Sequence, residues 1–294
     1  MKNFSQYNPI INFTFYAGAI LFGMFFIHPA FLVVSLGFAI TFHITIKGSE
    51  SLKFLGGLLT FACLLAVLNP LINSRGERIL FTYLGGRPYT MEALLYGFAI
   101  SIMFVAVIIW FSTYNQIMTS DKFLYIFGRI APSGSTVLTM TLRFVPNYRN
   151  KIIQLSNSRS AIGLGISGKK KQKVENALMI ISSLITWAFE GGIVTADSMK
   201  SRGHGTGART SFALYSFDVR DKTLLVLIIV LEIITLTCGI MGAAETEYTP
   251  KLYIQSMNSG CFVAGITAYI LLLAIPTILN LMEEIKWRIS RSRI

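Results

Sequence analysis

The most informative stretch of the chain runs from Trp187 to Asp221: WAFEGGIVTADSMKSRGHGTGARTSFALYSFDVRD. It begins as the end of a long amphipathic helix, whose last turn carries Arg202, and a run of glycines stops that helix. An ordinary helix end accounts for Ser201-Arg202-Gly203, because a cation complements the negative end of the helix dipole and glycine readily takes the left-handed conformation. A second basic helix end, Ser158-Arg159-Ser160, occurs earlier, and both ends lie among apolar segments.

Around this stretch the composition is that of a membrane protein. Of the 294 residues, 53% are hydrophobic and only 14% are charged, and the mean hydropathy is +0.60. Soluble domains carry about 25% charged residues, so lipid is the expected main solvent. We therefore predict an all-α integral membrane protein.

Six apolar runs with few or no charges are long enough to cross about 30 Å of hydrocarbon. The predicted spans are residues 11–27, 30–46, 54–72, 92–112, 222–243 and 257–282. The first is short, and only His28 and Pro29 separate it from the second. It could therefore tilt, re-enter the membrane or pair with the second span as a hairpin.

The basic residues predict the orientation. The segment 113–222 holds 15 of the 26 lysines and arginines, and others lie in the 47–53 loop and the C-terminal tail. By the positive-inside rule these regions face the cytoplasm, which places both termini inside and requires an even number of crossings. Basic loops against anionic headgroups account for most of the net charge of +12. No nucleic-acid motif accompanies the charge, so nucleic acid is excluded as a partner.

Between residues 113 and 221, charges interrupt the apolar residues at helical spacing. We predict a short interfacial helix at 121–130 and two long amphipathic helices at about 135–160 and 174–202. Pro146 is expected to kink the first long helix. The apolar stripes of these helices need a cover from lipid, from each other or from a partner. The predicted domains are 1–112 (a bundle of about four spans), 113–221 (cytoplasmic, with the two long helices) and 222–294 (two spans and a basic tail).

Few residues suggest chemistry within the chain itself. No catalytic constellation is found, and His28, His43 and His204 are too scattered for a metal site. The run GLGISGKK at 163–170 lacks the Ser or Thr of a phosphate-binding loop and the strand before it. We therefore expect no bound metal or cofactor. Glu232, near the middle of the fifth span, is a candidate functional or helix-packing residue, because an unpaired charge there is costly.

One family shares several of these features. Leu142-Arg143-Phe144-Val145-Pro146 resembles the first coupling helix of the transmembrane T component of energy-coupling factor transporters, and Ser158-Arg159-Ser160 occupies the place of its first Arg motif. These transporters import vitamins and transition metals into prokaryotes. The likeness covers about residues 120–221. The signature sequence of the T component resembles Ala196-Asp197-Ser198-Met199-Lys200-Ser201-Arg202-Gly203, followed by Gly205, Arg209-Thr210 and Asp218.

The resemblance implies two cytoplasmic coupling helices that cross in an X, each ending in a three-residue motif with a central arginine. Each motif would dock on one of two ABC-type ATPases, which would bind the ATP and Mg²⁺, while a membrane S component would bind the substrate. The family usually has Ala-Arg-Gly at both helix ends, and this sequence departs from that pattern. The ATPase-coupling residues would be Ser158, Arg159, Ser160, Ser201, Arg202 and Gly203.

The function expected from this resemblance is that of a coupling subunit in the prokaryotic cell membrane, which is not itself an enzyme. It would link ATP hydrolysis to reorientation of the S component for uptake of a vitamin or other micronutrient. The alternative is a self-contained secondary carrier or channel with Glu232 on its path, active without ATPases. A membrane enzyme is disfavoured, because no catalytic constellation is present.

Overall fold

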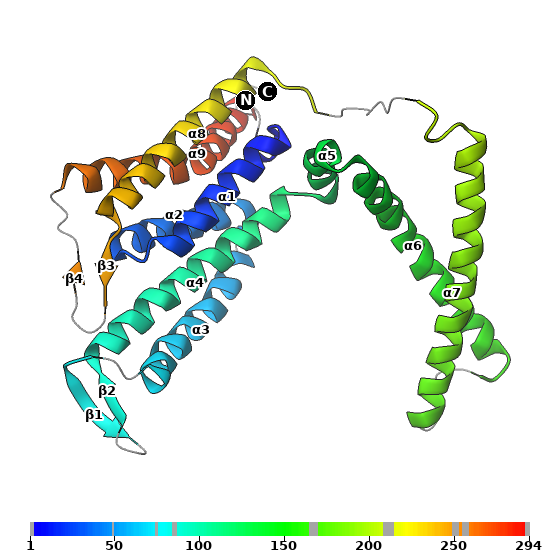
Figure 1. Ribbon diagram of the computed structural model, residues 1–294, viewed down its shortest axis with the longest axis horizontal. Helices are drawn as coiled ribbons and strands as arrows, with labels where there is room; N and C mark the ends of the chain where they lie inside the picture. The colour runs from blue at the N-terminus through cyan, green and yellow to red at the C-terminus, as the bar shows by residue number, and fades with distance from the viewer. Residues whose placement is uncertain are drawn as a thin grey trace. The chain divides into compact units, whose positions relative to one another are not determined.

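The computed structural model describes residues 3–48, 50–73, 76–83, 87–164, 170–207, 215–248, 253–254 and 259–291. The chain divides into two compact units: residues 1–123 with 215–294 form unit 1, and residues 124–214 form unit 2. In the described residues nearly all regular structure is helical (Figure 1). The predicted all-α membrane fold is therefore confirmed.

Every predicted span corresponds to a helix of unit 1. Its last helix extends past the predicted end at residue 282, because the polar sequence that follows is still favourable for helix. The helices are α1 (Pro9–Phe25), α2 (Pro29–Lys47), α3 (Glu50–Ile72), α4 (Met91–Ile117), α8 (Val219–Cys238), its π-helical continuation η2 (Gly239–Ala243) and α9 (Gly260–Arg291), preceded by the short η1 (Phe4–Gln6).

The first two helices start in the same way, with a capping side chain followed by proline. The Ile10 amide donates to Asn8 Oδ1 at 3.1 Å, and the Ala30 amide donates to His28 Nδ1 at 3.2 Å. Proline suits the first helical position, where its missing N–H costs no bond. The first predicted span is thus a separate helix of 17 residues, the shortest of the apolar helices described in unit 1.

Six described helices are long and apolar enough to cross a membrane: α2, α3, α4, α8 with η2, α9, and α7 (Lys170–Ser201) of unit 2. The number agrees with the six predicted spans, but the membership differs. The short α1 is left out because of its length, and α7 enters because part of it reaches a mean hydropathy of 1.7.

The core of unit 1 is built around α4, which packs against α1, α2 and α3, while α9 packs against α8 and α2. Aromatic side chains dominate it, with Phe15, Tyr16 and Phe42 all in ring contact with Trp110. Close approach of α3 and α4 requires Gly97, since a Cβ there would lie 2.7 Å from the Ala66 carbonyl oxygen. This dense packing makes unit 1 a rigid platform.

Two short antiparallel hairpins, which the sequence analysis did not predict, occupy loops of unit 1. β1 (Ile79–Tyr83) pairs with β2 (Arg87–Thr90) between α3 and α4. β3 (Thr246–Glu247) pairs with β4 (Tyr253–Ile254) between η2 and α9. The Arg78 amide donates to both carboxylate oxygens of Glu92, at 3.2 Å each, which fixes the first hairpin to α4.

The chain starts and finishes at one end of unit 1. The Phe4 amide donates to Asn280 Oδ1 at 3.1 Å, and η1 packs against α9. At this same end, the Lys122 ammonium donates to the Ser5 carbonyl oxygen. Residues near both termini and the start of the segment after α4 therefore lie together. That this end faces the cytoplasm stays a prediction.

The predicted helices of the central segment are also present. α5 (Ser120–Ile130) leads into unit 2, where α6 (Pro132–Ala161) is followed by α7. Helix α6 continues through Pro146, and the predicted kink there stays a prediction. Of the lysine-rich loop at 168–173, only residues 170–173 are described, and they form the first turn of α7.

Candidate coupling site

Helix α7 ends in a Schellman motif whose cap residue is Arg202. The Gly203 amide donates to the Lys200 carbonyl and the His204 amide to the Met199 carbonyl, both at 3.0 Å. Gly203 has a φ of +77°, a conformation that glycine adopts without a steric penalty. The Arg202 side chain is exposed and, within the described residues, makes no hydrogen bond or ion pair. A guanidinium is thus presented at the end of a 32-residue helix.

Helix α6 ends in the same motif, but its arginine lies one turn earlier. The Gly163 amide donates to the Ser160 carbonyl at 3.1 Å, and the Leu164 amide donates to the Arg159 carbonyl at 2.9 Å. Gly163 has a φ of +79°. The residue that corresponds to Arg202 is therefore Ile162, and Arg159 stands about one helical turn before it. The two arginines, which the sequence presented as equivalent, occupy different positions.

Arg159 is also engaged where Arg202 is not. Its Nη2 donates to Asn176 Oδ1 of α7 at 3.0 Å. The Arg159 side chain is half-buried, and its Nε is buried without a partner among the described residues. This bond ties the end of α6 to the beginning of α7. Since a guanidinium carries five N–H donors, the bond leaves others for a further acceptor.

The serines beside the two arginines bond to their own helices. Each hydroxyl donates to a carbonyl three or four residues earlier, at 2.9 Å, and so keeps only acceptor capacity. Each serine is therefore a small side chain whose donor is already used. The pairs are Ser158 with Gln154, Ser160 with Ser156, and Ser201 with Ser198.

A second contact holds α6 and α7 together. The Tyr148 ring meets the Trp187 ring edge-on at a centroid distance of 5.6 Å, and Lys151 Nζ lies 5.5 Å from the Trp187 centroid. This contact and the Arg159–Asn176 bond are separated by the same number of residues on both helices, as antiparallel pairing requires. Figure 1 shows the two helices crossing within unit 2.

Beyond these contacts the helices of unit 2 leave large apolar side chains uncovered. Burial is slight along α7, where only 6% of the most apolar 18 residues are buried. Such an extent of exposed apolar surface indicates a partner or lipid contact. The exposed side chains include Val137, Leu138, Leu142, Val145, Ile152 and Ile153 of α6, and Leu178, Ile181, Ile185, Phe189, Ile193 and Val194 of α7.

Two curated proteins are similar to this chain, although no family model matches it. Both are named energy-coupling factor transporter transmembrane protein EcfT. The one from Streptococcus equi subsp. equi is 28% identical over 173 residues, and the match covers 54% of this chain and 64% of that relative. The chain is EcfT-like. The protein from Streptococcus thermophilus is 28% identical over 200 residues, and the match covers 62% of this chain and 74% of that relative.

These relatives confirm the resemblance to a T component that the sequence indicated. Together with the six apolar helices, they identify the EcfT-like chain as a multi-pass membrane protein. The matched part is less than two thirds of the length of the Streptococcus equi protein. Of the residues that carried the resemblance, Arg209 and Thr210 lie outside the described part of the chain.

In unit 1 of the EcfT-like chain, Glu232 lies in a groove between α1 and α8. The groove has a volume of about 370 Å³ and apolar walls that include Leu21 and Ile233. Glu232 Oε1 is buried and has no hydrogen-bond partner in the part of the chain that the structure describes. Thr14, which also lines the groove, already donates its hydroxyl to the Ile10 carbonyl. The carboxyl group thus sits in an apolar setting with an unmet bond.

The three histidines of the EcfT-like chain have separate structural roles. His43 Nδ1 lies 2.7 Å from Ser51 Oγ and its Nε2 lies 3.2 Å from Ser112 Oγ, which joins α2, α3 and α4. His28 caps α2, and His204 closes the turn after α7. Sequence reasoning missed Asn176. Its side chain is buried near the beginning of α7, and no pattern in the sequence indicated this.

Proposed function

We propose that this chain is the coupling subunit of an energy-coupling factor importer. The observation that carries the proposal is Arg202, which is exposed at the cap of a long helix and makes no side-chain hydrogen bond or ion pair within the described residues. The similarity to proteins named EcfT supports it independently. A guanidinium fork on a rigid helix end can form two parallel bonds with a carboxylate, which suits it to transmit a push between subunits.

In this proposal two ABC-type ATPases bind ATP and Mg²⁺, and the chain itself performs no catalytic step. One ATPase receives Arg202 with Ser201 and Gly203. The other receives Arg159 with Ser158 and Ser160, through the guanidinium donors that Asn176 leaves open. Because Arg159 is half-buried and already bonded, its contact is the weaker of the two. Closure of the ATPases on ATP moves both helix ends.

The apolar faces of α6 and α7 hold the second kind of partner, a membrane S component that binds a vitamin or other micronutrient. Large side chains such as Leu142 and Phe189 are exposed on these faces and need a cover. Movement of the helix ends then turns the S component and releases the substrate inward. The chain spans the cell membrane with both termini in the cytoplasm, as the basic loops predict.

A self-contained carrier is the alternative, and the observation that favours it is Glu232 Oε1, which is buried and has no partner among the residues that the structure describes. Such a carrier would move substrate in liposomes without ATPases, and Glu232→Gln would stop that flux. The groove around Glu232 is otherwise almost wholly apolar. A path for ions or polar solutes needs several polar groups, so the coupling role is preferred.

The test is a pull-down in detergent of this chain against the ABC ATPases of its organism. Wild type is compared with Arg159→Glu/Arg202→Glu. We expect wild type to capture an ATPase pair and the double variant to lose it, because two attractive contacts become repulsive. Arg202→Glu alone should cause the larger part of the loss, since Arg159 is partly committed to Asn176.

The matched control is Arg143→Glu/Arg149→Glu, which changes the net charge equally on exposed residues of α6 away from its end. It should capture the ATPases as wild type does. Equal capture by all three proteins would remove the two arginines from the contact. No capture by wild type would reject the coupling role, and ATPase-independent flux would then be measured.

A further inference from the structure

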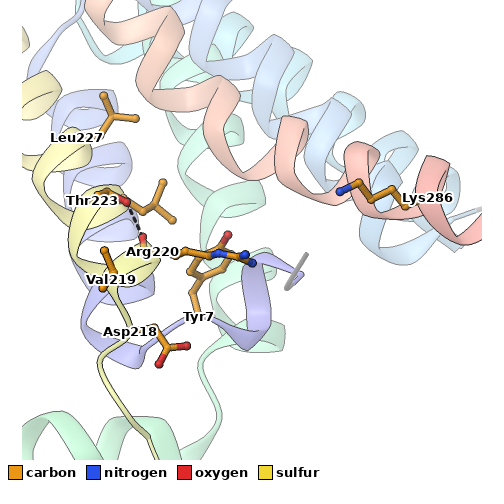
Figure 2. A pocket seen from close by; sticks show the side chains of 8 residues that line it. Tyr7, Asp218, Val219, Arg220, Thr223, Leu227 and Lys286 are labelled. Atoms are coloured by element: carbon orange, nitrogen blue, oxygen red, sulfur yellow. Dashed lines mark hydrogen bonds between the residues drawn. The ribbon is translucent and has the colours of Figure 1, made fainter.

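We infer that the cavity beside the start of α8 binds an anionic phospholipid. The cavity has a volume of about 1130 Å³ and lies wholly within unit 1, where Tyr7, the first turns of α8 and the last part of α9 line it (Figure 2). It is at the end of unit 1 where the chain begins and finishes, and therefore beside one leaflet of the membrane. No partner subunit is needed to form it.

Two cations face this cavity. Figure 2 shows the Arg220 guanidinium and the Lys286 ammonium extending toward one another from α8 and α9. Both side chains are exposed, and neither makes a hydrogen bond or ion pair within the described residues. Two unpaired cations that converge on one space from different helices have the chemistry that a phosphodiester requires.

The one carboxylate on the cavity wall, that of Asp218, is engaged elsewhere. It caps α8, since its side chain accepts from the backbone amide of Asp221, and the Asp221 carboxylate accepts from the Asp218 amide at 3.2 Å. Thr223 is likewise occupied, because its hydroxyl donates to the Arg220 carbonyl at 2.9 Å. The positive charge of Arg220 and Lys286 thus exceeds the negative charge of the wall.

Further along α8 from Arg220, the cavity wall becomes apolar. Leu224 and Leu227 follow Arg220 along α8, and Leu227 lies about 10 Å further along the helix axis. Leu227 is half-exposed, so its side chain is available for contact. The two cations match a phosphate headgroup, and the apolar wall next to them matches the start of an acyl chain. A free phosphate ion would use the cations and leave the leucines in contact with water.

The proposed ligand can be tested by native mass spectrometry of the full chain in detergent, titrated with phosphatidylglycerol or phosphatidylcholine. We expect wild type to prefer phosphatidylglycerol. Arg220→Gln/Lys286→Gln should weaken phosphatidylglycerol binding by roughly tenfold or more, since each cation near a membrane contributes a factor of about five. If the double variant does not fold, Lys286→Gln alone, which changes an exposed position, is tested instead. It should weaken phosphatidylglycerol binding about fivefold.

The matched control is Lys222→Gln/Arg291→Gln, which removes two positive charges near the same end of α8 and α9 but outside the cavity wall. It should bind phosphatidylglycerol as wild type does. An equal loss in both double variants would show general charge attraction and overturn the site. Displacement of phosphatidylglycerol from wild type by inorganic phosphate would identify the ligand as free phosphate and overturn the lipid. Leu227→Asn should weaken phosphatidylglycerol binding. Unchanged binding by this variant would also overturn the lipid as the ligand.

Discussion

At the scale of single residues, Gly18 and Glu232 form a pair whose energy can be measured. A Cβ at position 18 would lie 2.2 Å from Glu232 Oε1 and 2.8 Å from its carboxyl carbon. The carboxyl group must therefore move if Gly18 is replaced. Because these atoms are the far end of a flexible side chain, which can shift, we expect Gly18→Ala to destabilise the chain by only about 1 kcal/mol, measured by thermal unfolding in detergent.

In a Glu232→Ala background the sign should reverse, because the clash is gone and alanine is favoured over glycine in a helix by about 1 kcal/mol. The four proteins make a double-mutant cycle, and purely additive effects would contradict the contact. Gly37→Ala in α2 is the control. Nothing lies within 4 Å of the Cβ that it adds, so only the gain in helix propensity should appear.

The residues of the candidate coupling site were predicted to different degrees. Arg202 could be placed at a helix end because the glycine after it is a local signal, and the Schellman motif confirms that position. For Arg159 the cap glycine lies further along the chain, at Gly163. Its bond to Asn176 crosses the loop between two helices. Periodicity along one helix carries no information about such a partner.

At the scale of elements, Trp187 holds α7 against α6. Its ring makes a T-shaped contact with the Tyr148 ring and a cation–π contact with the Lys151 ammonium. Each contact of this kind contributes about 0.5–1.5 kcal/mol. We expect Trp187→Ala to separate the two helices and to speed hydrogen exchange of amides between residues 146 and 190. Hydrogen exchange with mass spectrometry measures this directly.

Phe189→Ala, two residues further along α7, is the control for the loss of a large aromatic side chain. Phe189 is 71% exposed, and within the described residues no ring contact of its own is found. It should leave the exchange of α6 unchanged. If both variants accelerate exchange equally, the Trp187 contact does not determine the pairing of α6 and α7.

Hydrophobic runs predicted the helices of the chain well, because a span needs about 20 apolar residues and such runs are easily recognised. The hairpin of β1 and β2 was not predicted. Its first strand, ILFTY, is a short apolar run, and short runs do not distinguish strand from loop or helix. Helix α7 shows the converse, since it meets the length and hydropathy of a span although its place in the sequence suggests a different role.

At the scale of the whole molecule, the topology of unit 1 constrains α7. Unit 2 is connected to unit 1 through residues 123 and 215. Lys122 donates to the Ser5 carbonyl, and Asp218 lines the same cavity as Tyr7. Both connections therefore leave unit 1 at the end where the chain begins. A segment that leaves and returns on one side of a membrane crosses it an even number of times or not at all.

A single crossing by α7 is incompatible with this constraint, because α6 does not qualify as a second span in unit 2. We expect Ser183→Cys, at an exposed position midway along α7, to react with a membrane-impermeant thiol reagent from the side that carries the termini. The background lacks Cys63, Cys238 and Cys261. Leu80→Cys, exposed in β1, is the control and should react only from the opposite side. Labelling of position 183 from that opposite side, or from neither side, would place α7 across the bilayer and remove it from reach of a cytoplasmic ATPase.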